Sequence, residues 1–217
     1  MTEQEALAAL RGDDVAEAAR AANVLWQMWH RSGSVQVDGL LREGIAAMER
    51  QDLVAADATF TRLIEEAPAF AEGWNKRATV RYMAGDYPAS IADCRETLAR
   101  NPHHFGALSG QGLCHLALGQ FGEAAELFRR TLAVHPHLGS ARNNLRAALS
   151  EIVKLNCAGL LSHWRSPRAR RGSGCRHEAP RLPRQNGGAC RWSLPPDGRA
   201  ARPPSYSLRP GSPRHPP

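Results

Sequence analysis

Residues 71–104 read AEGWNKRATVRYMAGDYPASIADCRETLARNPHH, and residues 105–138 read FGALSGQGLCHLALGQFGEAAELFRRTLAVHPHL. Both stretches have the same length, with a glycine in the middle and a proline near the end. The prolines Pro68, Pro102 and Pro136 consequently recur every 34 residues. A fixed period of this length is typical of proteins in which similar units stack on their neighbours.

Residues 37–70 supply a third copy, and four columns of the alignment agree down the stack. Apolar residues spaced three and four apart on both sides of the turn predict two helices in each unit. Proline then ends the second helix, because its ring cannot continue the hydrogen-bond ladder and it restricts the preceding residue. The columns are Leu40, Trp74 and Leu108; Gly44, Ala78 and Gly112; Ala56, Ser90 and Ala124; Phe60, Cys94 and Phe128.

The column of glycine and alanine predicts close packing within each helix pair. Glycine inside a helix costs about 1 kcal/mol relative to alanine, so its presence needs a structural reason. We expect each small residue of the first helix to face a small residue of the second, which lets the backbones approach. We expect large residues to fill the space between successive units: Leu40, Trp74, Leu108, Phe60 and Phe128.

The pattern resembles the tetratricopeptide repeat (TPR) family. The middle unit carries EGWNKRA, AGDYPAS and ARNP, and the last carries GQGLCHLALGQFGEAAELF and HP. The first unit departs from the pattern, with Arg50 and Gln51 where the turn glycine is expected. The resemblance covers roughly residues 37–138. It implies an all-α, right-handed solenoid of helical hairpins, and more narrowly it points to small bacterial TPR proteins of unassigned function.

The flanking segments complete the predicted organisation. Residues 14–31 form an amphipathic helix with Trp26 and Trp29 on one face, and residues 139–153 have the spacing of a capping helix. The predicted parts are an N-terminal helical cap or degenerate half-repeat at 1–36, three TPR units at 37–70, 71–104 and 105–138, a capping helix at 139–153, and a disordered basic tail rich in Pro, Arg and Gly at 154–217.

The tail leaves three interpretations open. It contains thirteen basic and two acidic residues, a charge suited to nucleic acid or an anionic surface. Its composition of Pro, Gly, Ser and Arg also fits a disordered extension that buries no core. Because those residues have G- and C-rich codons, a frameshifted end of a GC-rich gene is the third interpretation.

The sequence favours a cytoplasmic protein. No apolar run approaches the roughly 20 residues that span a bilayer, and the start, MTEQEALAALRGDD, has no basic flank, apolar centre or cleavage site. The five cysteines include no close pair, so a disulfide framework is not expected. A periplasmic location is the alternative if the true start lies upstream and includes a leader.

The residues predict no catalytic, cofactor or metal site. His103 and His104 follow one repeat proline, and His135 and His137 bracket the next; we interpret all four as exposed loop residues between helices. Neither a carboxylate nor a cysteine pair completes a tetrahedral metal set near them. GALSGQG lies within a predicted helix and follows no strand, so it is no phosphate loop. We expect Cys94 to pack in the core, because its column otherwise holds phenylalanine.

The resemblance implies a protein-binding scaffold or adaptor rather than an enzyme. In TPR proteins the first helices of successive units line a concave groove for a peptide or partner helix. The positions that grip a terminal carboxylate in the best-known TPR pocket are mostly Leu, Ile, Thr, Ser and Gly here, so an apolar or helical partner fits better. The chain's own Trp26, Met28 and Trp29 form the competing occupant of this groove. The predicted groove residues are Leu41, Ile45, Met48, Asn75, Thr79, Tyr82, Met83, Ser109, Leu113, Leu116 and Asn143.

Overall fold

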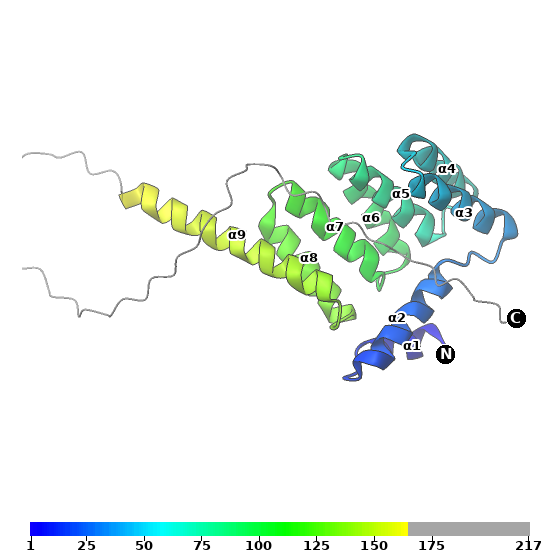
Figure 1. The fold of residues 1–217 in the computed structure, drawn as a ribbon, viewed down its shortest axis with the longest axis horizontal. Coiled ribbons are helices and arrows are strands. Elements are labelled where there is room, and N and C mark those ends of the chain that lie inside the picture. Colours follow the sequence, from blue (N-terminus) through cyan, green and yellow to red (C-terminus); the bar gives the residue numbers. More distant parts are fainter. Residues whose placement is uncertain (165–217) are drawn as a thin grey trace, which may run out of the picture. The chain divides into compact units, whose positions relative to one another are not determined.

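A computed structural model describes the backbone of residues 1–164 and the side chains of residues 1–156. Every regular element in this part of the chain is a helix (Figure 1). The helices are α1 (Glu3–Leu10), α2 (Val15–Trp29), α3 (Val35–Glu49), α4 (Leu53–Glu66), α5 (Ala71–Met83), α6 (Tyr87–Arg100), α7 (Phe105–Ala117), α8 (Phe121–Val134) and α9 (Gly139–Trp164).

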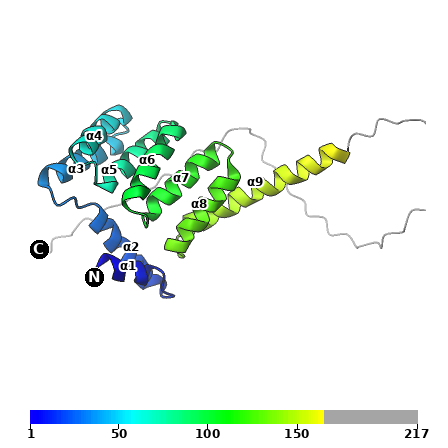
Figure 2. The same ribbon diagram turned by 180° about the vertical axis from the view of Figure 1, so that it is seen from behind.

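Helices α3 to α9 pack in sequence order, each against the next along the chain (Figures 1 and 2). The first helices of successive units, α3, α5 and α7, also contact one another, and α7 contacts α9. The first helices therefore form one layer and the second helices, α4, α6 and α8, form another. This arrangement confirms the predicted all-α solenoid of helical hairpins.

The turn inside each unit has the same backbone geometry. Gly85 and Gly119 adopt positive φ angles of 82° and 72°, and Gln51, one period earlier, adopts φ 62°. Left-handed geometry is favourable for glycine and costs a residue with a Cβ about 1–2 kcal/mol. Asp52 and Asp86 then cap the second helices by accepting hydrogen bonds from backbone N–H groups. The first unit therefore makes the same turn without the favoured residue.

The small-residue column packs against aromatic rings rather than against other small residues alone. A Cβ at Gly44 would lie 2.4 Å from Phe60 Cε1, and one at Gly112 would lie 2.8 Å from Phe128 Cε1. The glycines therefore make room for the phenylalanine ring of the same hairpin. The predicted small-to-small contact occurs in the middle unit, where the Ser90 hydroxyl donates to the Ala78 carbonyl at 2.7 Å.

Trp74 is only partly buried, so its ring does not lie wholly in the core between units. The guanidinium groups of Arg77 and Arg100 both lie over its ring, at 5.2 and 4.5 Å from the ring centroid. Its indole N–H donates to the Pro68 carbonyl at 3.0 Å. A polar indole edge and two cationic neighbours hold this ring at the surface of the stack.

Ion pairs centred on the buried Asp93 connect the first and middle units. Arg77 donates two 2.9 Å hydrogen bonds to the Asp93 carboxylate, and Arg81 lies 2.9 Å from the same group. Arg81 also reaches Asp57 on α4 at 3.2 Å. Bidentate arginine–carboxylate pairs fix orientation as well as distance. The cluster therefore ties α4, α5 and α6 together in one register.

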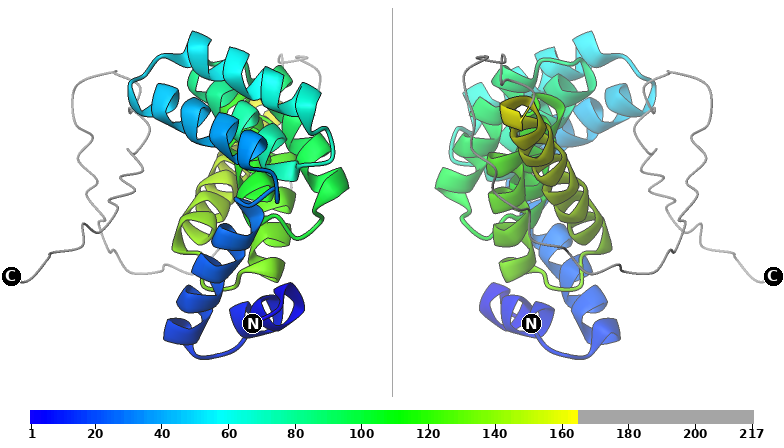
Figure 3. Two further views of the ribbon diagram at one scale, coloured as in Figure 1. Left: turned by 90° about the vertical axis from the view of Figure 1, so that its right-hand side faces the viewer. Right: turned by 90° about the vertical axis from the view of Figure 1, so that its left-hand side faces the viewer.

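The N-terminal segment is a helical hairpin rather than the single helix that the amphipathic pattern predicted. Helix α1 begins with a capping box between Thr2 and Glu5, and Asp14 caps α2. The hairpin packs on α7 and α8, through a core that includes Leu10, Leu25 and Phe105 (Figures 1 and 3). It therefore covers the later repeats and not the one that follows it in sequence.

Helix α9 continues to Trp164, beyond residue 153, where we expected the capping helix to end and a disordered tail to begin. The composition of the chain changes near residue 154, where basic residues and prolines become frequent. The first of these prolines is Pro167, however, so no proline ends the helix before that residue. The rest of the predicted tail lies outside the described residues. Among the helices that the structure describes, none combines the length and apolar character of a membrane span.

Candidate partner-binding groove

The structure distributes the predicted groove residues over three levels of exposure. The central helix α5 presents Thr79 and Met83 to solvent, and Met83 is 40% exposed. The buried members are Leu41, Asn75 and Ser109; the partly buried members are Ile45, Met48, Tyr82, Leu113 and Leu116; and the exposed members are Thr79, Met83 and Asn143. The open part of the face is therefore centred on the last turns of α5.

The start of the same face is crossed by the chain's own segment Trp26–Ser32. This segment meets one column of the repeats, Asp38, Glu72 and Gly106, whose members are spaced by the 34-residue period. The Trp26 ring lies on Gly106 of α7, where a Cβ would be 2.6 Å from ring atom Cη2. His30 Nε2 lies 3.3 Å from Glu72 Oε1 on α5.

The crossing ends at α3, where the backbone N–H and hydroxyl of Ser32 donate to Asp38 at 2.8 and 2.6 Å. These hydrogen bonds hold the pKa of Asp38 below its ordinary value. The segment thus contacts all three repeats, in reverse order of the repeats.

Glu72 is the electrostatic centre of the crossing. Its side chain is 1% exposed, and Oε2 accepts hydrogen bonds from His104 Nε2 at 2.9 Å and Asn75 Nδ2 at 3.2 Å. Oε1 lies 3.2 Å from the Lys76 ammonium, in addition to His30. Three elements, α2, α5 and the α6–α7 connection, therefore meet at one carboxylate.

The surroundings keep Glu72 ionised. Burial alone raises the pKa of this carboxyl, but the Lys76 charge, the hydrogen bond and charge of His104 and the charge of His30 outweigh it and lower the pKa to about 2. A buried carboxylate needs such compensation, because an isolated buried charge is strongly unfavourable. Glu72 is therefore an ionised carboxylate at the start of α5, compensated by its neighbours.

His104 is fully buried, so the prediction that it is an exposed loop residue is wrong. Its Nδ1 accepts from the Ala107 N–H at 3.0 Å and caps α7, which leaves Nε2 as the donor to Glu72. Trp29 stacks on the imidazole with ring centroids 4.7 Å apart. The packing of α2 over this joint removes it from solvent.

The other loop histidines divide between buried and partly exposed positions. His135 is 7% exposed, and burial together with nearby His137 lowers its pKa, so the predicted exposure is wrong for this residue as well. His137 is partly buried and its Nε2 lies 2.7 Å from the Gly12 carbonyl, while His103 is exposed as predicted. These contacts hold the α1–α2 hairpin from the α8–α9 side.

The two cysteines of the repeats, Cys94 and Cys114, pack in the core. Cys94 is 2% exposed, which confirms its predicted place in the core, and burial raises its pKa. Cys114 is also buried, with its Sγ 3.2 Å from the Ser90 hydroxyl. Within the described residues, no three metal-binding side chains gather at one point.

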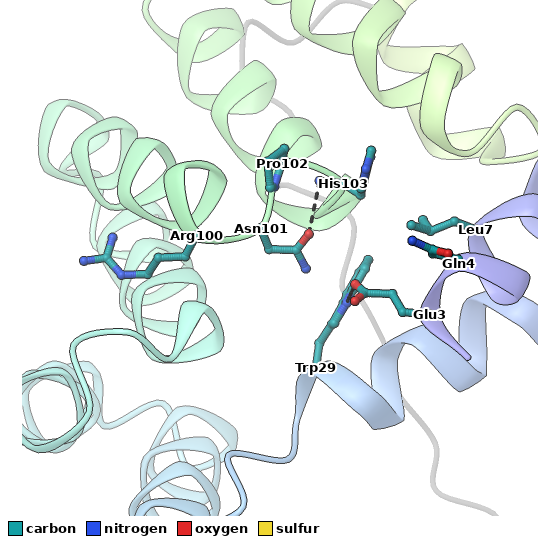
Figure 4. Close-up of a pocket in the computed structure, with 8 residues that line it drawn as sticks. All are labelled: Glu3, Gln4, Leu7, Trp29, Arg100, Asn101, Pro102 and His103. Carbon is teal, nitrogen blue, oxygen red and sulfur yellow. Dashed lines mark hydrogen bonds between the residues drawn. The ribbon is translucent and has the colours of Figure 1, made fainter. Parts of the chain in front are cut away.

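A small cavity lies beside the crossing segment, between α1, Trp29 and the α6–α7 connection (Figure 4). Its volume is about 380 Å³. Trp29 forms one wall and donates its indole N–H to Glu3 at 2.8 Å. Arg100 extends away from Trp29 in Figure 4, because its guanidinium binds Glu96 and the Pro68 carbonyl. The cavity residues are Glu3, Gln4, Leu7, Trp29, Arg100, Asn101, Pro102 and His103.

Comparisons with known proteins agree with this architecture. The tetratricopeptide repeat family model matches residues 41–103 and 80–137. A TPR repeat-containing protein of Rhizobium etli is 32% identical over 126 residues, which cover 58% of this chain and 62% of the relative. The chain therefore spans less than two thirds of that relative's length.

Two solved structures share the fold. The Sgt2 TPR domain of Aspergillus fumigatus superposes with a TM-score of 0.56 at 20% identity, covering 66% of this chain and 92% of that domain. The first TPR domain of Spaghetti (RPAP3), bound to an HSP90 peptide, gives 0.53 at 21% identity, covering 54% and 93%. These likenesses show that the stacked helical hairpins have the tetratricopeptide repeat fold, and the family match shows that residues 41–137 are similar to the tetratricopeptide repeat family.

Proposed function

We propose that this chain is a non-enzymatic protein-binding module that holds a peptide or helix of a partner protein against α3, α5 and α7. The observation that carries this proposal is the open face around Thr79 and Met83, bordered by partly buried apolar side chains. Apolar surface in a concave repeat face suits a partner that buries apolar side chains. An adaptor or assembly role follows from this chemistry.

The chemistry of the face favours an apolar or helical partner over an acidic chain end. The RPAP3 domain was solved with an HSP90 peptide. In this chain the first-helix positions hold residues such as Leu41, Ile45 and Thr79 in place of the basic residues that grip a terminal carboxylate.

The test is capture of partners by the full chain, with Thr79→Arg as the blocking variant. Thr79 is exposed, so arginine there adds bulk and charge to the groove without disturbing the core. Ala92→Arg on the exposed side of α6 is the matched control, because it places the same side chain on a second helix. We expect Thr79→Arg to lose the partner and Ala92→Arg to retain it.

The alternative is association with nucleic acid through the basic tail, and the same assay separates the two functions. A chain that ends at Trp164 keeps all nine described helices and removes the arginine-rich residues that follow. Under the groove proposal this shorter chain retains its partner. Loss of the partner in the shorter chain, with retention in Thr79→Arg, would refute the groove and support the tail.

A further inference from the structure

We propose that the α1–α2 hairpin is a built-in occupant of the groove, which a partner helix of matching chemistry replaces. The matching helix carries two aromatic residues one turn apart, followed by a basic residue, as do Trp26, Trp29 and His30. This proposal rests on the proposed function, because it concerns the same face of the repeats and names the class of partner.

The surface beneath the hairpin selects such a helix by charge. Glu72 is an ionised carboxylate that faces the end of α2, and the His30 imidazole is the group that approaches it from there. His30 Nδ1 lies 2.7 Å from the Trp26 carbonyl and Nε2 lies 3.3 Å from the carboxylate. Both ring nitrogens of His30 therefore lie near oxygen atoms. A lysine or arginine at this place would bring a positive charge to the same carboxylate.

The surface also selects aromatic rings by shape. Gly106 leaves a flat place for Trp26, whose ring meets Phe105 edge-on with centroids 5.2 Å apart. The Lys76 ammonium lies over the other part of this ring, 6.0 Å from its centroid. Trp29 then stacks on His104 one turn later. Rings paired in this way add stabilisation beyond the apolar area that they bury.

The hairpin covers this surface incompletely. The cavity of about 380 Å³ remains between Trp29, α1 and the α6–α7 connection (Figure 4). Met28, on the same helix, is 38% exposed and does not fill it. The link to α3 contains Gly33 at φ 83°, a conformation that glycine adopts without strain. The short link at Gly33 and the unfilled cavity suit a hairpin that leaves the groove as one unit.

The experiment measures binding of a labelled synthetic peptide of residues 14–31 to the full chain by fluorescence anisotropy. The undocked receptor carries Trp26→Ala and Trp29→Ala, which remove the competing rings and leave Glu72, His104 and Gly106 intact. We expect the peptide to bind this variant at least about tenfold more tightly than the wild type, because the intramolecular competitor is gone. A peptide with both tryptophans changed to alanine should not bind.

A charge variant of the receptor completes the test. Glu72→Gln in the undocked chain should weaken peptide binding about tenfold, since it removes the ion pair with the peptide's His30. Glu65→Gln, the same change at an exposed position of α4, should leave binding unchanged. If the double tryptophan variant does not fold, His30→Glu provides a second undocked receptor, because it sets two carboxylates against each other.

Three results would overturn the proposal. They are equal peptide affinity in the wild type and in both undocked variants, insensitivity to Glu72→Gln, and a wild-type dimer in light scattering whose hairpins are exchanged between copies. The peptide assay reports on the column Asp38, Glu72 and Gly106, whereas capture with Thr79→Arg reports on the rest of the groove. The inference and the proposed function can therefore fail separately.

Discussion

His104 Nε2 lies 2.9 Å from Glu72 Oε2, and both side chains are buried. Glu72 belongs to α5 and His104 to the α6–α7 connection, so the pair joins segments on either side of α6. The imidazole donates while its other nitrogen caps α7. One histidine thus fixes the start of a helix and compensates a buried charge. Because α2 also reaches this carboxylate, the pair links the stability of the repeats to the docking of the hairpin.

Glu72→Gln is expected to lower the free energy of unfolding by about 1–3 kcal/mol, the usual cost of disrupting buried hydrogen bonds. The amide keeps the shape but leaves the Lys76 ammonium without its counter-charge. Urea denaturation of the variant and the wild type measures the difference. Glu65→Gln on the surface of α4 should stay within about 0.5 kcal/mol of wild type, and an equal loss there would remove the special role of Glu72.

Acid should destabilise the wild type more than Glu72→Gln. The folded pKa of Glu72, about 2, lies below its unfolded value of 4.5, so its contribution is complete above pH 4.5 and disappears as the pH falls toward 2. Stability of both proteins measured across this interval should therefore converge with acidification. Curves that stay parallel would show that Glu72 does not titrate differently on unfolding.

Gln51→Gly should stabilise the protein by about 1 kcal/mol. Gln51 holds the left-handed backbone geometry that glycine holds at the equivalent positions of the other two units. The converse variant, Gly85→Gln, should lose a similar amount. Thermal unfolding of both variants checks the pair, and a destabilised Gln51→Gly would mean that the glutamine side chain contributes more than the turn costs.

Gly112→Ala should destabilise the last unit, although alanine is the better helix former. The new methyl group would lie 2.8 Å from the Phe128 ring, and overpacking of about 1–3 kcal/mol exceeds the propensity gain of about 1 kcal/mol. Gly122→Ala on α8 is the control, because nothing lies within 4 Å of its new Cβ. Chemical denaturation should show a loss for the first variant and a gain for the second.

Gly106→Ala should loosen the N-terminal hairpin while leaving the repeats folded. Its Cβ would lie 2.6 Å from the Trp26 ring, so α2 has to move away. Hydrogen exchange should then increase in residues 15–29. Gly110→Ala, on the same helix, places its Cβ at an ordinary 3.7 Å from Cys94 Sγ and should leave exchange in α2 as in the wild type. Unchanged exchange in Gly106→Ala would contradict the docking contact.

The sequence predicted the repeat architecture because its signals are periodic. Prolines at one interval and glycines at the turns mark the ends of helices, and each signal is local in the chain. The positive φ of Gln51 follows from the same period, since a stacked unit must turn like its neighbours. Helix α1 was missed because it is short and lies outside the period.

The site was harder to predict, because it depends on a contact between distant segments. The place of His104 shortly after Pro102 predicts exposure, yet its column also holds Phe70 and Leu138, and this apolar column is the available signal for burial. No period relates Trp26 or His30 to the repeats, so nothing in the pattern located the surface that they cover. The buried, ionised state of Glu72 could not be predicted for the same reason.

The strap formed by Trp26–Ser32 has a consequence for how this gene can change. Solenoids ordinarily tolerate the duplication or loss of a whole unit, because every junction is equivalent. Here Asp38, Glu72 and Gly106 each contact a different residue of one short segment. The three units are therefore not interchangeable. Removing the middle unit would place a glycine beneath the His30 ring and leave the Trp26 ring without its glycine. A segment that is not itself a repeat thereby constrains the number of repeats.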